Sequence, residues 1–168
     1  MLTSKKTVFS ACVGLMAVSS LVSAKDVVEA RLMSLSLASD IASEAVRACA
    51  ASGYQVSAVV VDRSGTTQVV MRDVFASRFT IEIAERKANA VVLSGVGSGE
   101  FRVNRADILA EMNEVNGILV LEGGLPIRAA GSLLGAVGVS GAPGGDKDAE
   151  CAKAGLASVL ERLEFAGD

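Results

Sequence analysis

The segment Leu121–Pro143, LEGGLPIRAAGSLLGAVGVSGAP, decides the fold, because turn-forming and strand-forming residues alternate along it and it holds both prolines of the chain. Glu122-Gly123-Gly124 is typical of a turn, and Leu125–Arg128 is typical of a short strand. Ala130-Gly131 predicts a second turn, and Leu133–Ser140 an apolar strand of small residues. We therefore expect two strands joined by a tight turn.

Glycines in and just after the second of these strands leave its surface open to close contact. Gly135, Gly138 and Gly141 carry no side chain, so another backbone or a flat ligand can approach the strand closely. The simpler interpretation is a central strand covered by helices. The alternative is that the same glycines line a ligand surface.

The composition limits what the chain can be. A length of 168 residues suffices for one domain with a substantial core. Half of the residues are apolar, but with one Tyr, five Phe and no Trp the core must consist of Val, Leu, Ile and Ala. This composition argues against an aromatic platform for single-stranded nucleic acid. The net charge of −3 and the lack of a basic cluster make nucleic acid an unexpected partner.

The chain contains no histidine. This absence excludes Ser-His-Asp and Cys-His nucleophile systems, and it excludes a haem held by a histidine of the same chain. It also leaves a poor ligand set for a tetrahedral zinc site. Because no nucleophile–base pair is recognisable, we expect no enzymatic turnover by the protein alone.

Residues 1–24 have the features of a secretory signal peptide. Lys5-Lys6 provides a positive start, Thr7–Val22 an apolar run, and small residues up to Ala24 a cleavage site. The apolar run is short for a membrane span of about 20 residues, although an uncleaved anchor is the alternative. We expect cleavage after Ala24, a single mature domain over residues 25–168, and a periplasmic or secreted location.

Cleavage would remove Cys12 and leave Cys49 and Cys151. An exported chain with two cysteines can form one disulfide, provided that the two helices predicted to carry them bring their Cα atoms within about 7 Å. The alternative, slightly favoured because cysteine is often simply a buried apolar residue, is a pair of thiols in the core.

The first half of the chain predicts one helix and a hairpin. Apolar residues recur at three- and four-residue spacing over Ser34–Ser52, which predicts a helix. The β-branched run Tyr54–Asp62 predicts a central strand, and Thr66–Arg72 predicts its partner. Arg63-Ser64-Gly65 is too short for a parallel crossover, so the two strands should be antiparallel.

The second half continues the alternation of helices and strands. Ser77–Leu93 predicts a helix, and SGVGSG at 94–99 ends it without the spacing or lysine of a P-loop. A helical turn is expected at Arg105–Met112, a third strand at Gly117–Leu121 and a last helix at Asp148–Phe165. Strands in groups with short loops indicate an α+β fold with a mainly antiparallel, five-stranded sheet.

Four segments resemble a known family. They are VVVDRSGTTQVVMRD at 59–73, IAERKANAV at 83–91, EGGLPI at 122–127 and GAVGVSGAPGGDKDAECAKAG at 135–155. Together they are similar to the GlcG/HbpS-type haem-binding proteins, also called the haem-degrading family, over Leu35–Leu163. The resemblance implies a profilin-like fold, self-assembly into dimers or up to octamers, and haem as the cofactor.

The resemblance also suggests where a ligand would bind. Arg72 and Arg78 are candidates to hold haem propionates, since arginine forms forked bonds to carboxylates. For Arg72 the alternative is a structural pair with Asp73. Lys87 matches the helix lysine of the family, and it either reaches a ligand carboxylate or lies along its helix. Met71 is either a thioether ligand or a core residue.

Three functions are possible for these residues. The resemblance implies an exported haem-binding protein that senses or sequesters haem or responds to redox state. Some family members bind haem through a histidine, which this chain lacks. Any haem degradation would be oxidant-driven at the bound haem. The alternatives are a module for a small carboxylate such as glycolate, and an oligomeric partner of a membrane sensor that binds no haem.

Overall fold

The computed structural model describes residue 26 and residues 30–167, and the compact unit considered below is Arg31–Asp168. The predicted signal peptide, residues 1–24, and its cleavage after Ala24 lie outside the described residues. Within the described part, no helix is both long and apolar enough to cross a membrane.

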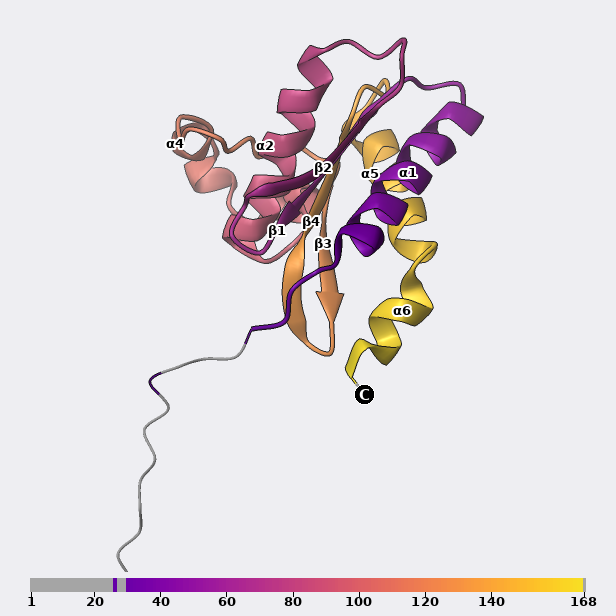
Figure 1. Ribbon diagram of the computed structural model, residues 1–168. Coiled ribbons are helices and arrows are strands. Elements are labelled where there is room, and N and C mark those ends of the chain that lie inside the picture. The colour runs from indigo at the N-terminus through magenta and orange to yellow at the C-terminus, as the bar shows by residue number, and fades with distance from the viewer. Residues whose placement is uncertain (1–25, 27–29, 168) are drawn as a thin grey trace, which may run out of the picture. The chain divides into compact units, whose positions relative to one another are not determined.

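A four-stranded antiparallel sheet forms the centre of the fold, with the strand order β2-β1-β4-β3 (Figure 1). The strands are β1 (Ser57–Asp62), β2 (Thr67–Arg72), β3 (Gly124–Ala129) and β4 (Ser132–Ser140). The turn predicted at Ala130-Gly131 joins β3 to β4, and both of its residues have positive φ. The α+β class and the antiparallel pairing are therefore confirmed.

The prediction of a fifth strand at Gly117–Leu121 is wrong, and the sheet has four strands. The amide of Leu119 donates to the carbonyl of Arg86 in a helix, at 3.1 Å, rather than to a strand. The amide of Val120 donates to Asn113 Oδ1 at 2.8 Å. The apolar residues that suggested a strand are instead buried against the helices beside them.

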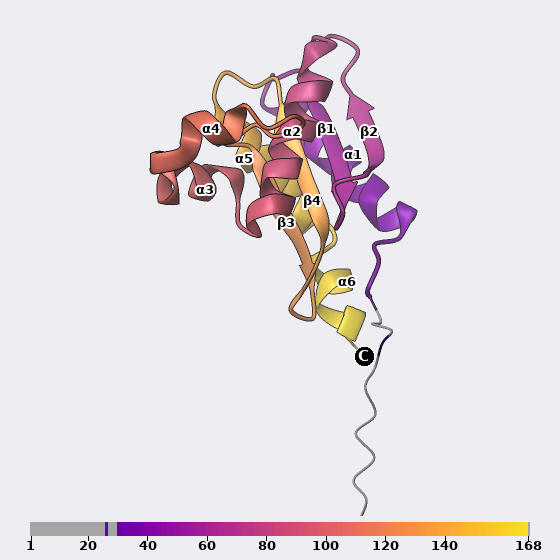
Figure 2. The same cartoon turned by 90° about the vertical axis from the view of Figure 1, so that its left-hand side faces the viewer.

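Helices cover both faces of the sheet (Figures 1 and 2). Helices α1 and α5 pack together on one face, while α2 covers the other. Two short helices, α3 and α4, lie beside α2. The bounds are α1 (Leu35–Ala51), α2 (Phe79–Ser94), α3 (Ser98–Asn104), α4 (Leu109–Asn113), α5 (Gly145–Ala157) and α6 (Leu160–Glu164), with 3-10 turns η1 (Ala106–Ile108) and η2 (Phe165–Gly167).

Local chemistry explains two of the helix ends. Ser34 caps α1 by accepting the amide of Leu37 at 3.2 Å, and Gly95 ends α2 with a φ of +75° that favours glycine. The prediction of a single last helix at Asp148–Phe165 is wrong, because two helices, α5 and α6, occupy this part of the chain. They are separated at Val159, whose φ of −121° and ψ of 12° are not helical.

A disulfide joins the two helices on one face of the sheet. Cys49 of α1 and Cys151 of α5 are bonded, with their Cα atoms 5.4 Å apart. The alternative of two free thiols, slightly favoured from the sequence, is therefore wrong. The helices approach closely because Gly155 faces α1, where an added Cβ would lie 2.5 Å from the carbonyl oxygen of Ile41.

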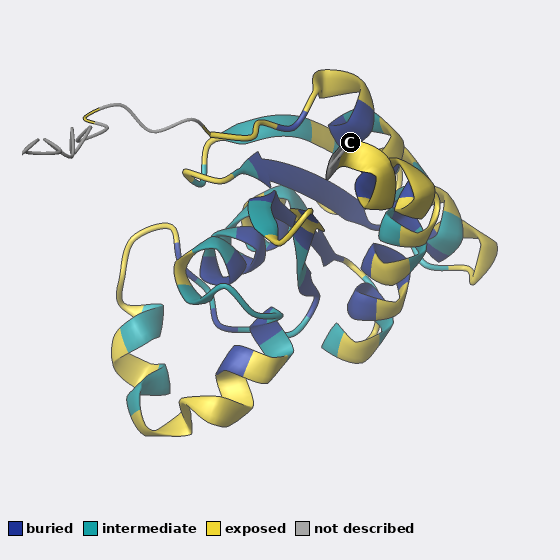
Figure 3. Cartoon of the chain, turned by 90° about the horizontal axis from the view of Figure 1, so that it is seen from below, coloured by how far each residue is buried: buried dark blue, intermediate teal, exposed yellow. Residues whose placement is uncertain are grey.

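The glycines of β4 meet backbone rather than open space. A Cβ at Gly138 would collide with the carbonyl of Ala84 in α2, and one at Gly135 would collide with the carbonyl of Val61 in β1. The interpretation of a central strand covered by helices is thus confirmed at Gly138, whereas Gly135 lies against the neighbouring strand. The central strands β1 and β4 are mostly buried, whereas the edge strand β2 is partly exposed. Figure 3 shows this buried centre and the exposed outer sides of the helices.

Candidate functional site

Lys87, the helix lysine expected near a ligand, lies inside the protein. Its side chain is 1% exposed, and its Nζ donates to Asp148 Oδ2 at 2.7 Å and to the carbonyl of Val139 at 3.0 Å. Burial raises the pKa of the Asp148 carboxyl above its ordinary value, and the hydrogen bond from Lys87 opposes that rise. This ion pair links α2 to the start of α5 and the end of β4.

Arg72, at the end of β2, organises the connection to α2. Its Nη1 donates to the carbonyls of Asp73, at 3.1 Å, and Val74, at 3.2 Å, and also to that of Ala76. The Asp73 carboxylate accepts the amide of Phe75 at 2.8 Å instead of pairing with the guanidinium. Arg72 is thus held at the surface by backbone carbonyls, and no ion pair with Asp73 forms.

Arg78 ends the same connection, and its guanidinium lies 4.0 Å from the centroid of the Phe79 ring. The large apolar side chains of the same connection are exposed: Val74 is 74% exposed, Phe75 84% and Phe79 57%. Exposed aromatic residues grouped in this way are typical of binding surfaces. We call this feature the arginine–phenylalanine surface, made of Val70, Arg72, Val74, Phe75, Arg78 and Phe79.

Met71 lies away from this surface. Side chains alternate along a strand, so Met71 points to the opposite side of β2 from Arg72, and it packs against the core beneath α1. The structure therefore groups Arg72 with Arg78 on one short connection. It places Met71 and Lys87 elsewhere, one in the core and one in a buried ion pair.

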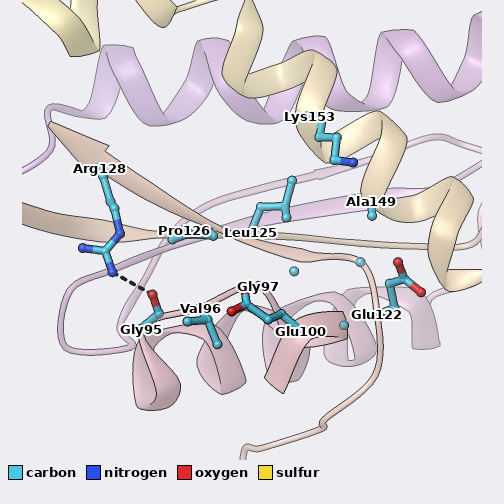
Figure 4. Close-up of a pocket in the computed structure, with 13 residues that line it drawn as sticks. Gly95, Val96, Gly97, Glu100, Glu122, Leu125, Pro126, Arg128, Ala149 and Lys153 are labelled. Carbon is cyan, nitrogen blue, oxygen red and sulfur yellow. Dashed lines mark hydrogen bonds between the residues drawn. The ribbon is translucent and has the colours of Figure 1, made fainter. Parts of the chain in front are cut away.

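A pocket of about 500 Å³ forms where two glycine-rich segments meet (Figure 4). Residues 95–99, after α2, form one side of it, and residues 122–126 form the other. Arg128 lies at one end, where it donates to the carbonyl of Gly95 at 2.6 Å, and Lys153 enters from α5. We call it the glycine-lined pocket.

The charged residues of this pocket were missed by sequence reasoning. The glycines marked both segments as turns, but Arg128 and Lys153 line the same pocket only because β3 and α5 pack together. Glu100 and Glu122 also line the pocket, so both signs of charge are present. Among the described residues, no group of three or more Cys, Asp or Glu side chains could hold a metal ion.

Comparison with known proteins places the chain in a family. Residues 33–157 match the family model described as haem degrading protein HbpS-like. None of the curated proteins compared with the chain matches it.

Solved structures show the same fold. HbpS is 36% identical over 81% of this chain and 96% of its own, with a TM-score of 0.74. The protein ORFY of Klebsiella pneumoniae is 25% identical over 84% of this chain and 99% of its own, with a TM-score of 0.75. PduOC in complex with haem, at 22% identity over 76% of this chain and 95% of its own and a TM-score of 0.67, shares the fold. The resemblance seen in the sequence is confirmed, and the chain belongs to the HbpS-like family of haem degrading proteins.

Proposed function

We propose that this protein binds haem and that the arginine–phenylalanine surface is where it does so. One observation carries the proposal: Phe75 and Phe79 are exposed beside two arginines. Such a surface offers both apolar contact and cations. A related fold is known in complex with haem, that of PduOC, which supports the same cofactor here.

The chemistry of the surface fits that cofactor. The flat apolar ring of haem would pack on Phe75 and Phe79, and its two propionates would pair with Arg72 and Arg78. Arg72 uses Nη1 for backbone carbonyls, so its remaining donors are held in place for a ligand. Without histidine in the chain, binding would depend on apolar contact and on these charged pairs.

The surface supplies one wall for a flat ligand, because its apolar side chains are exposed. A second copy facing the first would close a slot around the ring. This geometry supports our proposal that the protein assembles into dimers or larger homo-oligomers. The same proposal includes a membrane sensor as a further partner, and the family resemblance is its support.

We also propose export, with cleavage after Ala24. Support comes from the features of residues 1–24 and from the Cys49–Cys151 disulfide, since disulfides persist mainly in oxidising compartments. Bound haem would supply iron chemistry with an added oxidant, while the protein would hold and orient it. Haem sensing or sequestration outside the cytoplasm is the role that fits these features.

The test is a titration of hemin into the mature protein, from Lys25 onward, followed by Soret absorbance with bovine albumin as a non-specific control. We expect a saturable, shifted band at one haem per chain or per dimer. Arg78→Ala together with Phe75→Ser should weaken binding about tenfold to a hundredfold. Arg102→Ala, which removes an exposed arginine of α3, should leave the affinity unchanged. A band like that of free hemin, or equal affinity in all variants, would reject the proposal.

A second candidate is a small carboxylate ligand, favoured by Arg128 and Lys153 in the glycine-lined pocket. A 2-hydroxy acid such as glycolate would bind there through forked bonds to the arginine. Lys153→Ala should weaken glycolate binding, measured by NMR line shifts, and leave hemin binding unaffected. Absence of any glycolate-induced shift would remove this candidate.

A further inference from the structure

A second cavity, of about 560 Å³, is lined by the end of α2 and by the arm formed by α3, η1 and α4. Figure 2 shows α3 and α4 beside α2. We call it the arm cavity. Its lining is mainly apolar and differs from that of the glycine-lined pocket. The apolar side chains that matter here are Val96, Phe101, Ile108 and Met112.

The arm above the cavity is lightly anchored. Neither η1 nor α4 contains a buried residue, and Phe101 is the apolar side chain of the arm that is buried against α2. Segments with few buried contacts open at low free-energy cost. Entry of a small molecule between the arm and α2 therefore needs no change in the sheet.

One cation stands at the edge of the cavity. Of the residues that line it, Arg105 is the charged one, and no carboxylate belongs to the lining. Arg105 donates from Nε and Nη2 to Asp107, at 3.1 and 3.3 Å, while its Nη1 has no hydrogen bond to a described residue. Ser94 and Asn104 add polar atoms to the lining. An occupant would therefore meet apolar walls and one guanidinium, whose charge is shared with Asp107.

We propose that the arm cavity binds a small apolar molecule that carries a single anionic group, such as a medium-chain fatty acid. The apolar walls favour the hydrocarbon part, since burial of apolar surface drives such binding. Arg105 favours the anion at the rim. This site is separate from the arginine–phenylalanine surface and does not depend on haem binding.

Decanoate is the probe, followed through displacement of the fluorescent anion 1-anilinonaphthalene-8-sulfonate and through the methyl signal of Met112 in carbon-labelled protein. We expect saturable binding at one decanoate per chain, with a shift of the Met112 methyl. Ile108→Glu should weaken binding about tenfold or more, because it places a like charge inside the cavity. Val103→Glu, the same change at a 76% exposed position on the same arm, should alter binding by about twofold at most.

Arg105→Gln, at an exposed position where folding is not at risk, separates the two parts of the proposal. It should weaken decanoate about threefold and leave decanol unchanged. Three results would each overturn the proposal. The first is an equal loss of affinity in Ile108→Glu and Val103→Glu, and the second is a Met112 methyl signal that does not shift on addition of decanoate. The third is an equal loss of affinity for decanoate and for decanol in Arg105→Gln.

Discussion

The two faces of the sheet differ in what they contribute. On one face, α1 and α5 lie over a continuous apolar core and are joined by the Cys49–Cys151 disulfide. On the other, α2 packs on the sheet through small residues such as Ala84 and Ala88, and the arm beside it is lightly buried. The arginine–phenylalanine surface and both pockets include α2 or the segments that directly adjoin it. One face thus holds the disulfide-linked helices, and the other holds most residues of the proposed binding sites, with Lys153 of α5 at the glycine-lined pocket as the exception.

Removal of the buried Lys87–Asp148 ion pair should have the largest effect on stability, and it tests how the helices on the two faces are held together. Lys87→Met should lower the free energy of unfolding by about 3–5 kcal/mol, because Asp148 would remain buried without its partner. Chemical denaturation measures this loss. Lys147→Met, which removes an exposed lysine from α5, is the matched control and should cost less than about 1 kcal/mol.

A double variant sharpens this test. Replacing Lys87 and Asp148 together by Met and Leu should restore part of the stability, since an apolar pair often replaces a buried ion pair without loss. If Lys87→Met and Lys147→Met cost the same, the pair does not hold α2 and α5 together.

The disulfide should give the next largest effect. Cys49→Ala with Cys151→Ala should lower the free energy of unfolding by about 2–5 kcal/mol, because the bond closes a long loop in the unfolded chain. Thermal unfolding with and without dithiothreitol measures it. The reductant should lower the Tm of the wild type and leave that of the variant unchanged. A wild-type Tm that does not respond to reduction would contradict a structural disulfide on this face.

The fold was largely predictable because its signals are local. Periodic apolar spacing identified α1 and α2, and the short connection at Arg63-Ser64-Gly65 identified the first hairpin. The strand predicted at Gly117–Leu121 failed because an apolar, extended run has the same pattern whether it pairs in a sheet or lies against helices. Tertiary packing, which the sequence does not show locally, decided between the two.

The candidate site was predictable only in part, for the same reason. Arg72 and Arg78 were predicted from the family resemblance, and they flank one short connection, while their role in binding stays a prediction. The sequence did not reveal that Lys87 is paired with Asp148, because the two residues are far apart along the chain and meet only when α2 and α5 pack on the sheet. Arg128 and Lys153 likewise line one pocket through the packing of β3 with α5.

Mapping of a bound porphyrin by two-dimensional amide NMR most directly tests the assignment of haem binding to the arginine–phenylalanine surface. Gallium protoporphyrin, a diamagnetic substitute for haem, would be added to labelled protein from Lys25 onward. We predict that shifts concentrate at residues 70–79, on the arginine–phenylalanine surface, with the disulfide face unchanged. Shifts confined to α1 and α5, or no saturable shifts at all, would contradict the assignment of haem binding to the α2 face.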